Sequence, residues 1–379
     1  MAESEIAGTA RGAGRARGFP RWMAPALASL ALISCGSPVD RSEGPVATAQ
    51  SGVVYGEDDR VELADFPDDA LRELARARVA AVMAHDTLSF DGHSVKVVAR
   101  SLGEAANLCE GERFADQPSA ALCSAILLDD RTVLTAGHCM RRIACSDAMF
   151  VLGYFLQPNG AEPVLNTEDV YGCQEVLART LSLPTATERI DFAWVRLDRP
   201  VHKPAPPVVL RPASAPLQVG ETVTVAGFSG GTPMKVRTGG RVADPRPDTL
   251  DFFVTTSDTF HGDSGAPVFD GELRLLGLHV RGNADYAATP AGCNTVSRLP
   301  DEPTAAGEEN TYVARTLVGL CESRPESVLC CSPLQPCAHV DPRAAASCSV
   351  GERTNIPFGS SLTALALIAL MTTARRTRC

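Results

Sequence analysis

The sequence predicts an all-β fold of the sandwich or barrel type. From about residue 94 onward, short runs rich in β-branched residues alternate with turns that contain glycine or proline, a pattern typical of many short strands. Of the 379 residues, 45% are hydrophobic and 21% are charged, which is enough apolar sequence for a sizeable core. We expect strands over residues 95–98, 125–128, 192–197, 223–227, 252–256 and 273–280.

The N-terminal region predicts export. Four arginines precede an apolar run from Met23 to Ser34, which is the layout of a signal peptide. The run ends in Leu-Ile-Ser-Cys35, which resembles a bacterial lipobox, in which the cysteine is lipidated. A plain signal peptide with a chance cysteine is the alternative. We therefore expect a signal peptide over residues 1–35, and a protein that is secreted or anchored in the cell envelope.

The rest of the chain divides by composition. Residues 36–52 are rich in small residues and proline and predict a linker or pro-segment, and apolar residues at helical spacing predict a helix over 66–84. Residues 301–357 are rich in proline and cysteine and predict a disulfide-tied stalk without a sizeable core. Residues 358–379 combine an apolar run with arginines and resemble the C-terminal sorting tails of myxobacterial surface proteins; a disordered tail is the alternative. Membrane association is expected through Cys35 or this C-terminal segment.

Charge and cysteine content exclude several functions. The net charge is −10 and the basic residues are scattered except near the two ends, which argues against nucleic-acid binding. The thirteen cysteines include no Cys-x-x-Cys zinc pair and favour an oxidising compartment. We expect a monomer and no cofactor. We also expect no metal site, because the histidines outside the motifs below show no ligand spacing: His85, His93, His202, His261 and His339.

Three segments carry the candidate chemistry. They are Val-Leu-Thr-Ala-Gly-His-Cys at 133–139, Ile-Asp-Phe-Ala-Trp-Val at 190–195 and Gly-Asp-Ser-Gly-Ala-Pro-Val-Phe at 262–269. Each closely resembles a catalytic segment of the chymotrypsin-like (trypsin-like) serine proteases, and they occur in that family's order of His, Asp and Ser. The resemblance implies two six-stranded antiparallel β-barrels with the active site in the cleft between them. It covers roughly residues 53–300, of which 61–108 match poorly.

The resemblance makes His138, Asp191 and Ser264 the catalytic triad. A serine hydroxyl needs a neighbouring base to become a nucleophile, and His138 would be that base. Asp191 would hold the imidazole in the right tautomer and stabilise its charged form. The amides of Gly262 and Ser264 would form the oxyanion hole. An α/β-hydrolase is disfavoured, because Ala266 breaks the Gly-x-Ser-x-Gly pattern of that fold.

The substrate preference has two competing indications. Residues 227–230 (Gly-Phe-Ser-Gly) and 53–60 resemble parts of bacterial glutamyl endopeptidases, and His279 and Thr259 lie where that branch carries residues that face an acidic side chain. Asp258 lies six residues before the candidate nucleophile, where trypsins carry the aspartate that binds lysine or arginine. We expect an acidic preference before the scissile bond, with a basic preference as the alternative.

Asp263 raises the question of activation, because a buried carboxylate needs a partner. That partner is either the amine of Val53 or Val54, freed by cleavage near Gly52, or an internal arginine. The first option would make the protein a zymogen.

Cysteine spacing leaves the disulfides open. Cys123 and Cys139 match a family disulfide, but Cys109–Cys123 together with Cys139–Cys145 is the alternative. Taken together, the sequence predicts a secreted serine endopeptidase that acts on protein or peptide substrates. The alternative is a catalytically silent protease-fold module for binding or adhesion at the cell surface.

Overall fold

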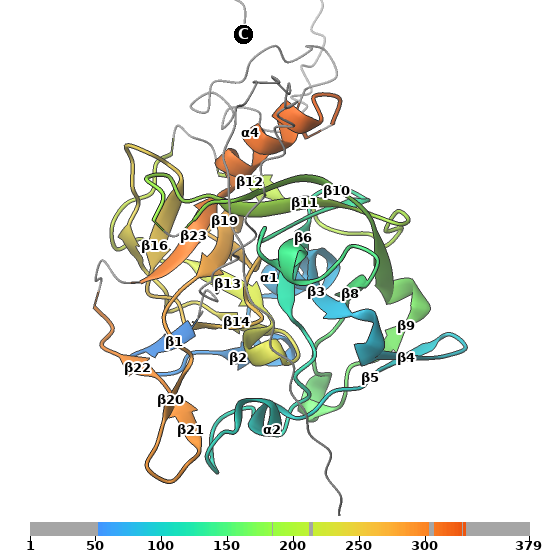
Figure 1. Ribbon diagram of the computed structural model, residues 1–379, viewed down its shortest axis with the longest axis vertical. Coiled ribbons are helices and arrows are strands. Elements are labelled where there is room, and N and C mark those ends of the chain that lie inside the picture. Colours follow the sequence, from blue (N-terminus) through green and yellow to red (C-terminus); the bar gives the residue numbers. More distant parts are fainter. Residues whose placement is uncertain (1–51, 184, 212–214, 303–306, 328, 331–379) are drawn as a thin grey trace, which may run out of the picture. The chain divides into compact units, whose positions relative to one another are not determined.

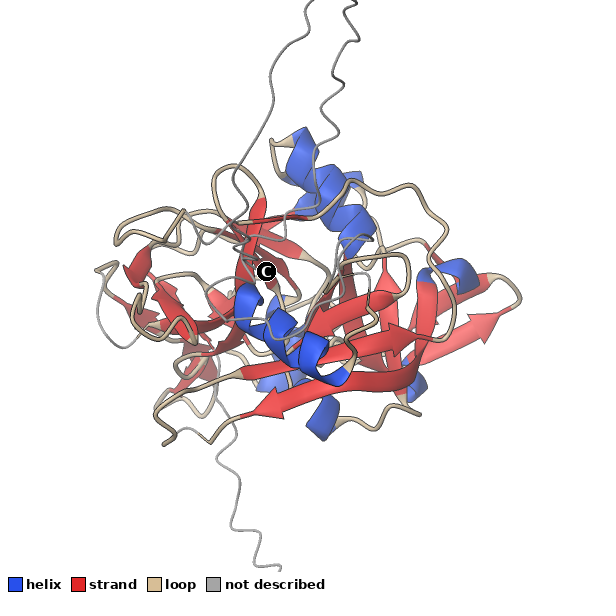
Figure 2. Ribbon diagram, turned by 90° about the horizontal axis from the view of Figure 1, so that it is seen from above, coloured by secondary structure: helices blue, strands red, loops and turns tan. Residues whose placement is uncertain are grey.

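A computed structural model describes residues 52–183, 185–211, 215–302, 307–327 and 329–330 (Figure 1). Strands are the main secondary structure of this part of the chain, with a few helices between them (Figure 2). The predicted signal peptide with Cys35, nearly all of the linker and the C-terminal sorting segment lie outside the described residues. Within the described ranges, no helix is long and apolar enough to cross a membrane.

Six antiparallel strands close into a barrel in the order β10-β11-β7-β6-β3-β8. Fully buried apolar side chains such as Val82, Leu134 and Val195 provide its core. The strands are β3 (Val79–Ala84), β6 (Cys123–Leu127), β7 (Thr132–Thr135), β8 (Ala148–Leu152), β10 (Val170–Leu181) and β11 (Asp191–Leu197).

A second, nine-stranded sheet follows the open order β15-β16-β23-β19-β18-β13-β14-β2, with β12 beside β19. The predicted all-β class is therefore confirmed together with one six-stranded barrel, whereas a second closed barrel and a cleft between two barrels stay predictions. The strands are β2 (Val61–Glu62), β12 (Val209–Leu210), β13 (Thr224–Gly227), β14 (Lys235–Arg237), β15 (Val242–Asp244), β16 (Phe252–Thr255), β18 (Pro267–Phe269), β19 (Arg274–Arg281) and β23 (Glu308–Tyr312).

Smaller sheets and helices complete the fold. In one of them the N-terminal strand β1 (Gly52–Tyr55) lies between β17 (Thr259–Phe260) and β22 (Arg298–Leu299). The other small strands are β4 (Leu88–Asp91), β5 (Ser94–Val97), β9 (Leu165–Asn166), β20 (Tyr286–Ala288) and β21 (Asn294–Val296). The helices are α1 (Asp69–Arg78), α2 (Leu102–Ala106), α3 (Cys139–Arg142) and α4 (Val313–Ser323).

The chain beyond residue 300 contributes to the folded protein. Strand β23 pairs with β16 and β19, and α4 packs against β10 and β11, as Figure 1 shows. Trp194 Nε1 of β11 donates a hydrogen bond of 2.8 Å to the carbonyl of Thr316 in α4. A stalk without a core does not describe residues 307–323, and the rest of the predicted stalk lies almost entirely outside the described residues.

Each predicted strand segment is a strand, but the predicted helix over 66–84 is too long. Helix α1 ends at Arg78, and the next six residues form barrel strand β3 between β6 and β8. The helix begins where Asp68 accepts hydrogen bonds from the amides of Ala70 and Leu71. Residues 79–83 are all buried, so barrel pairing overrides their helical spacing.

Four disulfides join the described residues. Cys123–Cys139 is confirmed, and the alternative set of Cys109–Cys123 with Cys139–Cys145 is wrong. The bonds link Cys109 to Cys293, Cys123 to Cys139, Cys145 to Cys173, and Cys321 to Cys330.

Candidate active site

His138 and Asp191 are in contact where two barrel strands meet. His138 follows the end of β7, and Asp191 opens the neighbouring strand β11. The His138 Nδ1 atom lies 2.8 Å from Asp191 Oδ2, and the His138 amide donates to Asp191 Oδ1 at 3.1 Å. Gly137 allows this approach, because a Cβ there would lie 2.4 Å from the carbonyl oxygen of Thr180. One carboxylate therefore fixes both the backbone and the ring of the histidine.

Arg281 provides a cation beside this pair. It lies on β19, and its Nη2 atom is 3.5 Å from Asp191 Oδ2. The same guanidinium pairs with Glu309 at 2.9 Å. Asp191 is 1% exposed, so a cation lies beside this buried carboxyl group.

Ser264 lies in a tight turn that packs against the segment carrying His138. The Ser264 carbonyl accepts a hydrogen bond of 2.8 Å from the amide of Ser124 in β6. Gly265 has a φ of +88°, and a Cβ there would lie 2.1 Å from the Ser124 carbonyl and 2.5 Å from Thr135 Oγ1. The turn that presents Ser264 is thus in direct contact with the strand that leads to His138.

The candidate oxyanion donors are the backbone amides of Gly262 and Ser264. Gly262 has a φ of +91°, and its carbonyl accepts a hydrogen bond from Ser124 Oγ at 2.8 Å. Among the described residues, neither amide donates to a backbone carbonyl. The 227–230 segment packs directly beneath, since a Cβ on Gly262 would lie 2.3 Å from the Phe228 carbonyl oxygen. Two such amides can donate hydrogen bonds to the negatively charged oxygen that develops when a substrate carbonyl is attacked.

Asp263 has an internal arginine as its partner. Arg237 Nη2 lies 2.7 Å from Asp263 Oδ1, and both side chains are buried. This contact is an ion pair without hydrogen-bond geometry. Asp263 Oδ2 accepts hydrogen bonds from the Phe260 amide at 2.9 Å and from Ser229. Its hydroxyl donates to Asp263 Oδ2 at 2.8 Å and accepts from Arg237 Nη1 at 2.8 Å. Of the two partners that the sequence left open, the described structure contains the arginine.

Asp258 is buried and holds the N-terminal segment. Its two oxygens accept hydrogen bonds from the amides of Tyr55 at 2.7 Å and Asp59 at 3.1 Å. Burial raises the pKa of Asp258 to about 7, against the effect of these hydrogen bonds. The carboxyl group that would bind a basic substrate is therefore engaged by the chain itself.

Thr259 and His279 meet in a fully buried group around Glu308. Thr259 Oγ1 donates to Glu308 Oε2 at 2.6 Å, and His279 Nε2 lies 3.9 Å from the same oxygen. The structure thus brings the two residues of the predicted acidic-substrate pocket together, with a carboxyl group of the chain between them.

Sequence reasoning missed Glu308, Arg237 and Arg281. Glu308 lies beyond the predicted domain boundary at residue 300, and no motif marks it. Arg237 and Arg281 end strands β14 and β19, and their roles follow from long-range pairing. The sequence contained a signal only for Arg237, because a buried carboxylate at Asp263 needs a cation as its partner.

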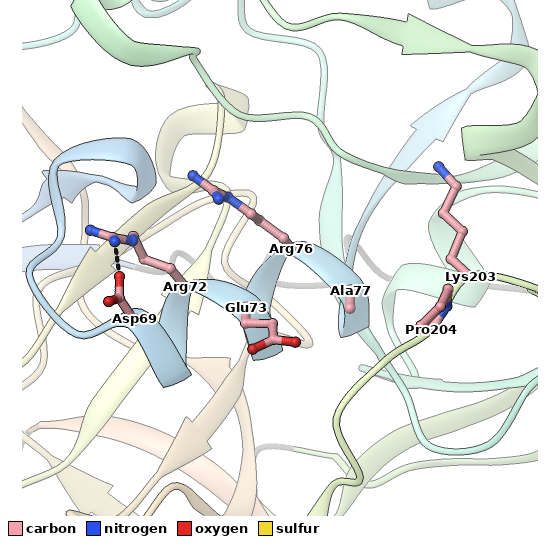
Figure 3. Close-up of a pocket in the computed structure, with 7 residues that line it drawn as sticks. All are labelled: Asp69, Arg72, Glu73, Arg76, Ala77, Lys203 and Pro204. Carbon is pink, nitrogen blue, oxygen red and sulfur yellow. Dashed lines mark hydrogen bonds and ion pairs between the residues drawn. The ribbon is translucent and has the colours of Figure 1, made fainter.

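Two other features of the described residues are a pocket and a group of side chains of metal-ligand type. A pocket of about 460 Å³ lies between α1 and the segment of Lys203 and Pro204 (Figure 3), and none of the predicted site residues lines it. Its Arg72 pairs with Asp69, and its Lys203 pairs with Asp169. Cys123, His138 and Cys139 are of metal-ligand type and close together, but the two cysteines are bonded to each other. The pocket residues are Asp69, Arg72, Glu73, Arg76, Ala77, Lys203 and Pro204.

Sequence comparison identifies the region that carries the candidate triad. Residues 123–278 match the family model of the trypsin-like peptidase domain. Two serine proteases of Mycobacterium tuberculosis, Rv3671c of strain H37Rv and MT3772 of strain CDC 1551, are each 34% identical over 99 residues. The match covers 23% of this chain and 24% of each relative, so it spans about a quarter of their length.

Solved structures of proteases also overlap with this chain. The VesB protease of Vibrio cholerae has a TM-score of 0.41 at 15% identity, over 70% of this chain and 66% of its own. A Glu endopeptidase has a TM-score of 0.40 at 17% identity, over 71% of this chain and 98% of its own. The fold described above rests on the strand pairing of this chain and not on these overlaps. Residues 123–278, which are less than half of this chain, are thus similar to the trypsin-like peptidase domain.

Proposed function

We propose that the protein is a serine endopeptidase that hydrolyses protein or peptide substrates through His138, Asp191 and Ser264. The observation that carries the proposal is the 2.8 Å contact between His138 and Asp191 beside the turn of Ser264. His138 takes the proton from the Ser264 hydroxyl as the serine attacks the carbonyl, and then gives it to the leaving amine. Asp191 keeps the Nδ1 proton in place, so Nε2 remains the base.

The turn around Ser264 provides the electrostatic part of this mechanism. The attack places negative charge on the carbonyl oxygen, and the amides of Gly262 and Ser264 are the donors that stabilise it. Arg237 neutralises Asp263 inside this turn and holds it in shape. Because Arg237 meets the need of Asp263 for a cation, an amine freed at Val53 is not required for this purpose.

Hydrolysis of labelled casein tests the proposal. Wild type should release peptides, whereas Ser264→Ala should lower the turnover number by about 10⁶-fold and Asp191→Asn by about 10⁴-fold. Equal melting temperatures of the three proteins would show that the losses are chemical. Casein turnover in Ser264→Ala at the wild-type rate would reject the triad, and an inactive wild type that binds a surface ligand would favour the silent module.

We also propose that the protein is exported, as the N-terminal sequence predicts. The four disulfides of the described residues support an oxidising compartment. Cell fractionation and the mass of the mature N-terminal peptide test this proposal together with lipidation of Cys35. An unprocessed N-terminus in the cytoplasm would contradict it.

A further inference from the structure

Glu308 places a carboxyl group beside the catalytic turn. It opens strand β23 and has no exposed surface. Its Oε2 atom accepts the hydrogen bond from Thr259, and its Oε1 atom accepts from the Tyr55 hydroxyl at 3.1 Å and the Asn283 amide at 3.2 Å. Both carboxyl oxygens are therefore engaged by groups of the chain.

The backbone is shaped to hold this carboxyl group. A Cβ at Gly282 would lie 1.6 Å from Glu308 Oε2 and 2.3 Å from its carboxyl carbon. No side chain larger than hydrogen fits at residue 282 while Glu308 keeps this position. The glycine provides the space that the carboxyl group fills.

The group around Glu308 adjoins the candidate nucleophile. Thr259 lies on β17, which directly precedes the turn, and His279 is paired with the residues that follow Ser264. The His279 amide donates to the Ala266 carbonyl at 2.9 Å, and its carbonyl accepts from the Gly265 amide at 2.7 Å. The group around Glu308 is therefore joined through the backbone of His279 to the residues that follow Ser264.

Burial shifts the pKa values of both Glu308 and His279 toward the uncharged forms. Burial raises the pKa of Glu308 to about 8, and burial lowers the pKa of His279 to about 3. Asn310 is a polar neighbour of the His279 ring, but within the described residues neither ring nitrogen has a hydrogen bond of good geometry, and Nε2 lies 3.9 Å from Glu308 Oε2. The imidazole is thus positioned toward a carboxyl group that it does not bind as an ion pair.

We propose that Glu308 is a built-in occupant of the substrate pocket: its carboxyl group takes the place of a substrate carboxylate between Thr259 and His279. The protease therefore cleaves after uncharged side chains and rejects acidic ones. This inference rests on the proposed function. The single hydroxyl proton of Thr259 is already donated to Glu308, and a second carboxylate would be buried without a cation. A basic side chain would lack a free acceptor on Glu308, because both carboxyl oxygens already accept hydrogen bonds from the chain.

Peptides that differ only in the residue before the scissile bond test this inference. The residue is Ala, Gln, Glu or Lys, and the enzymes are wild type, Glu308→Ala and Glu308→Gln, each titrated with a fluorophosphonate. Wild type should cleave after Ala or Gln at least about tenfold better than after Glu or Lys. Glu308→Ala should raise the kcat/KM ratio of Glu to Gln by at least about tenfold, because it frees the donors. Glu308→Gln keeps the pocket filled and should leave the ratio within about threefold.

Several results would overturn the inference. They are equal wild-type cleavage after Glu and Gln, a wild-type preference for Lys, and an unchanged ratio in a folded Glu308→Ala variant. Glu308→Thr, a β-branched residue suited to a strand, replaces the alanine variant if that variant does not fold. Fluorophosphonate labelling without cleavage of any peptide would overturn the pocket assignment alone, whereas absence of labelling would count against the proposed function itself.

Discussion

Replacing Arg237 by methionine would leave the carboxylate of Asp263 buried without its cation. Both side chains are almost completely inaccessible, at 1% and 0% exposure, and no other cation pairs with Asp263 among the described residues. Breaking a buried ion pair from one side costs about 3–5 kcal/mol. For a domain of this size, a loss of that order lowers the melting temperature by roughly 10 °C.

The matched double variant Arg237→Met/Asp263→Asn separates the pair from the packing. It removes both charges while keeping similar side-chain volumes, so it should recover most of the lost stability. Thermal and urea unfolding, followed by circular dichroism, measure the free energies of unfolding. A single variant within about 1 kcal/mol of wild type, or a double variant as unstable as the single one, would refute the role given to Arg237.

Three further predictions follow from the site. The form that still carries residues 36–52 should have a kcat/KM within about threefold of the form that begins at Val53. If the longer form is at least about 100-fold less active, cleavage is required for activity. Arg281→Met should lower kcat by about tenfold with little change in KM, because it removes the cation beside Asp191. An unchanged kcat in the folded variant would contradict this. Below about pH 6.5, the lowered pKa of His279 makes stability rise with pH and opposes the effect of Glu308. Wild-type stability should fall as pH rises from about 6.5 to 8, by at most about 1.4 kcal/mol per pH unit from Glu308, because the buried carboxyl group binds its proton more tightly in the folded state than in the unfolded state. Glu308→Gln should have a flatter stability profile over this range, though not a flat one because the pKa of Asp258 is also raised, and parallel profiles would contradict the assignment.

Local sequence signals predicted much of this protein. The apolar runs became strands because their residues are buried by pairing on both sides, as at Val195 in β11. The motifs around His138 and Asp191 predicted two side chains that the structure brings into contact. In both cases the relevant information lies within about ten residues of the site.

The features that the sequence did not reveal depend on distant parts of the chain. The segment from Val79 has apolar residues at helical spacing and is also a continuous apolar run. It forms a strand because it pairs with β6 and β8. Cys109 and Cys293 pair over 184 residues, which no spacing rule predicts. Glu308 enters the site because β23 pairs with β16 and β19, although its surroundings in the sequence resemble a linker.

The central claim is that Ser264 is an activated nucleophile. Intact-mass spectrometry after incubation with a fluorophosphonate tests it most directly, followed by mapping of the modified peptide. The account predicts a single adduct on Ser264, strongly slowed formation in His138→Ala and none in Ser264→Ala. A folded wild-type protein that gains no adduct, or one that is modified equally fast after loss of Ser264, would contradict it.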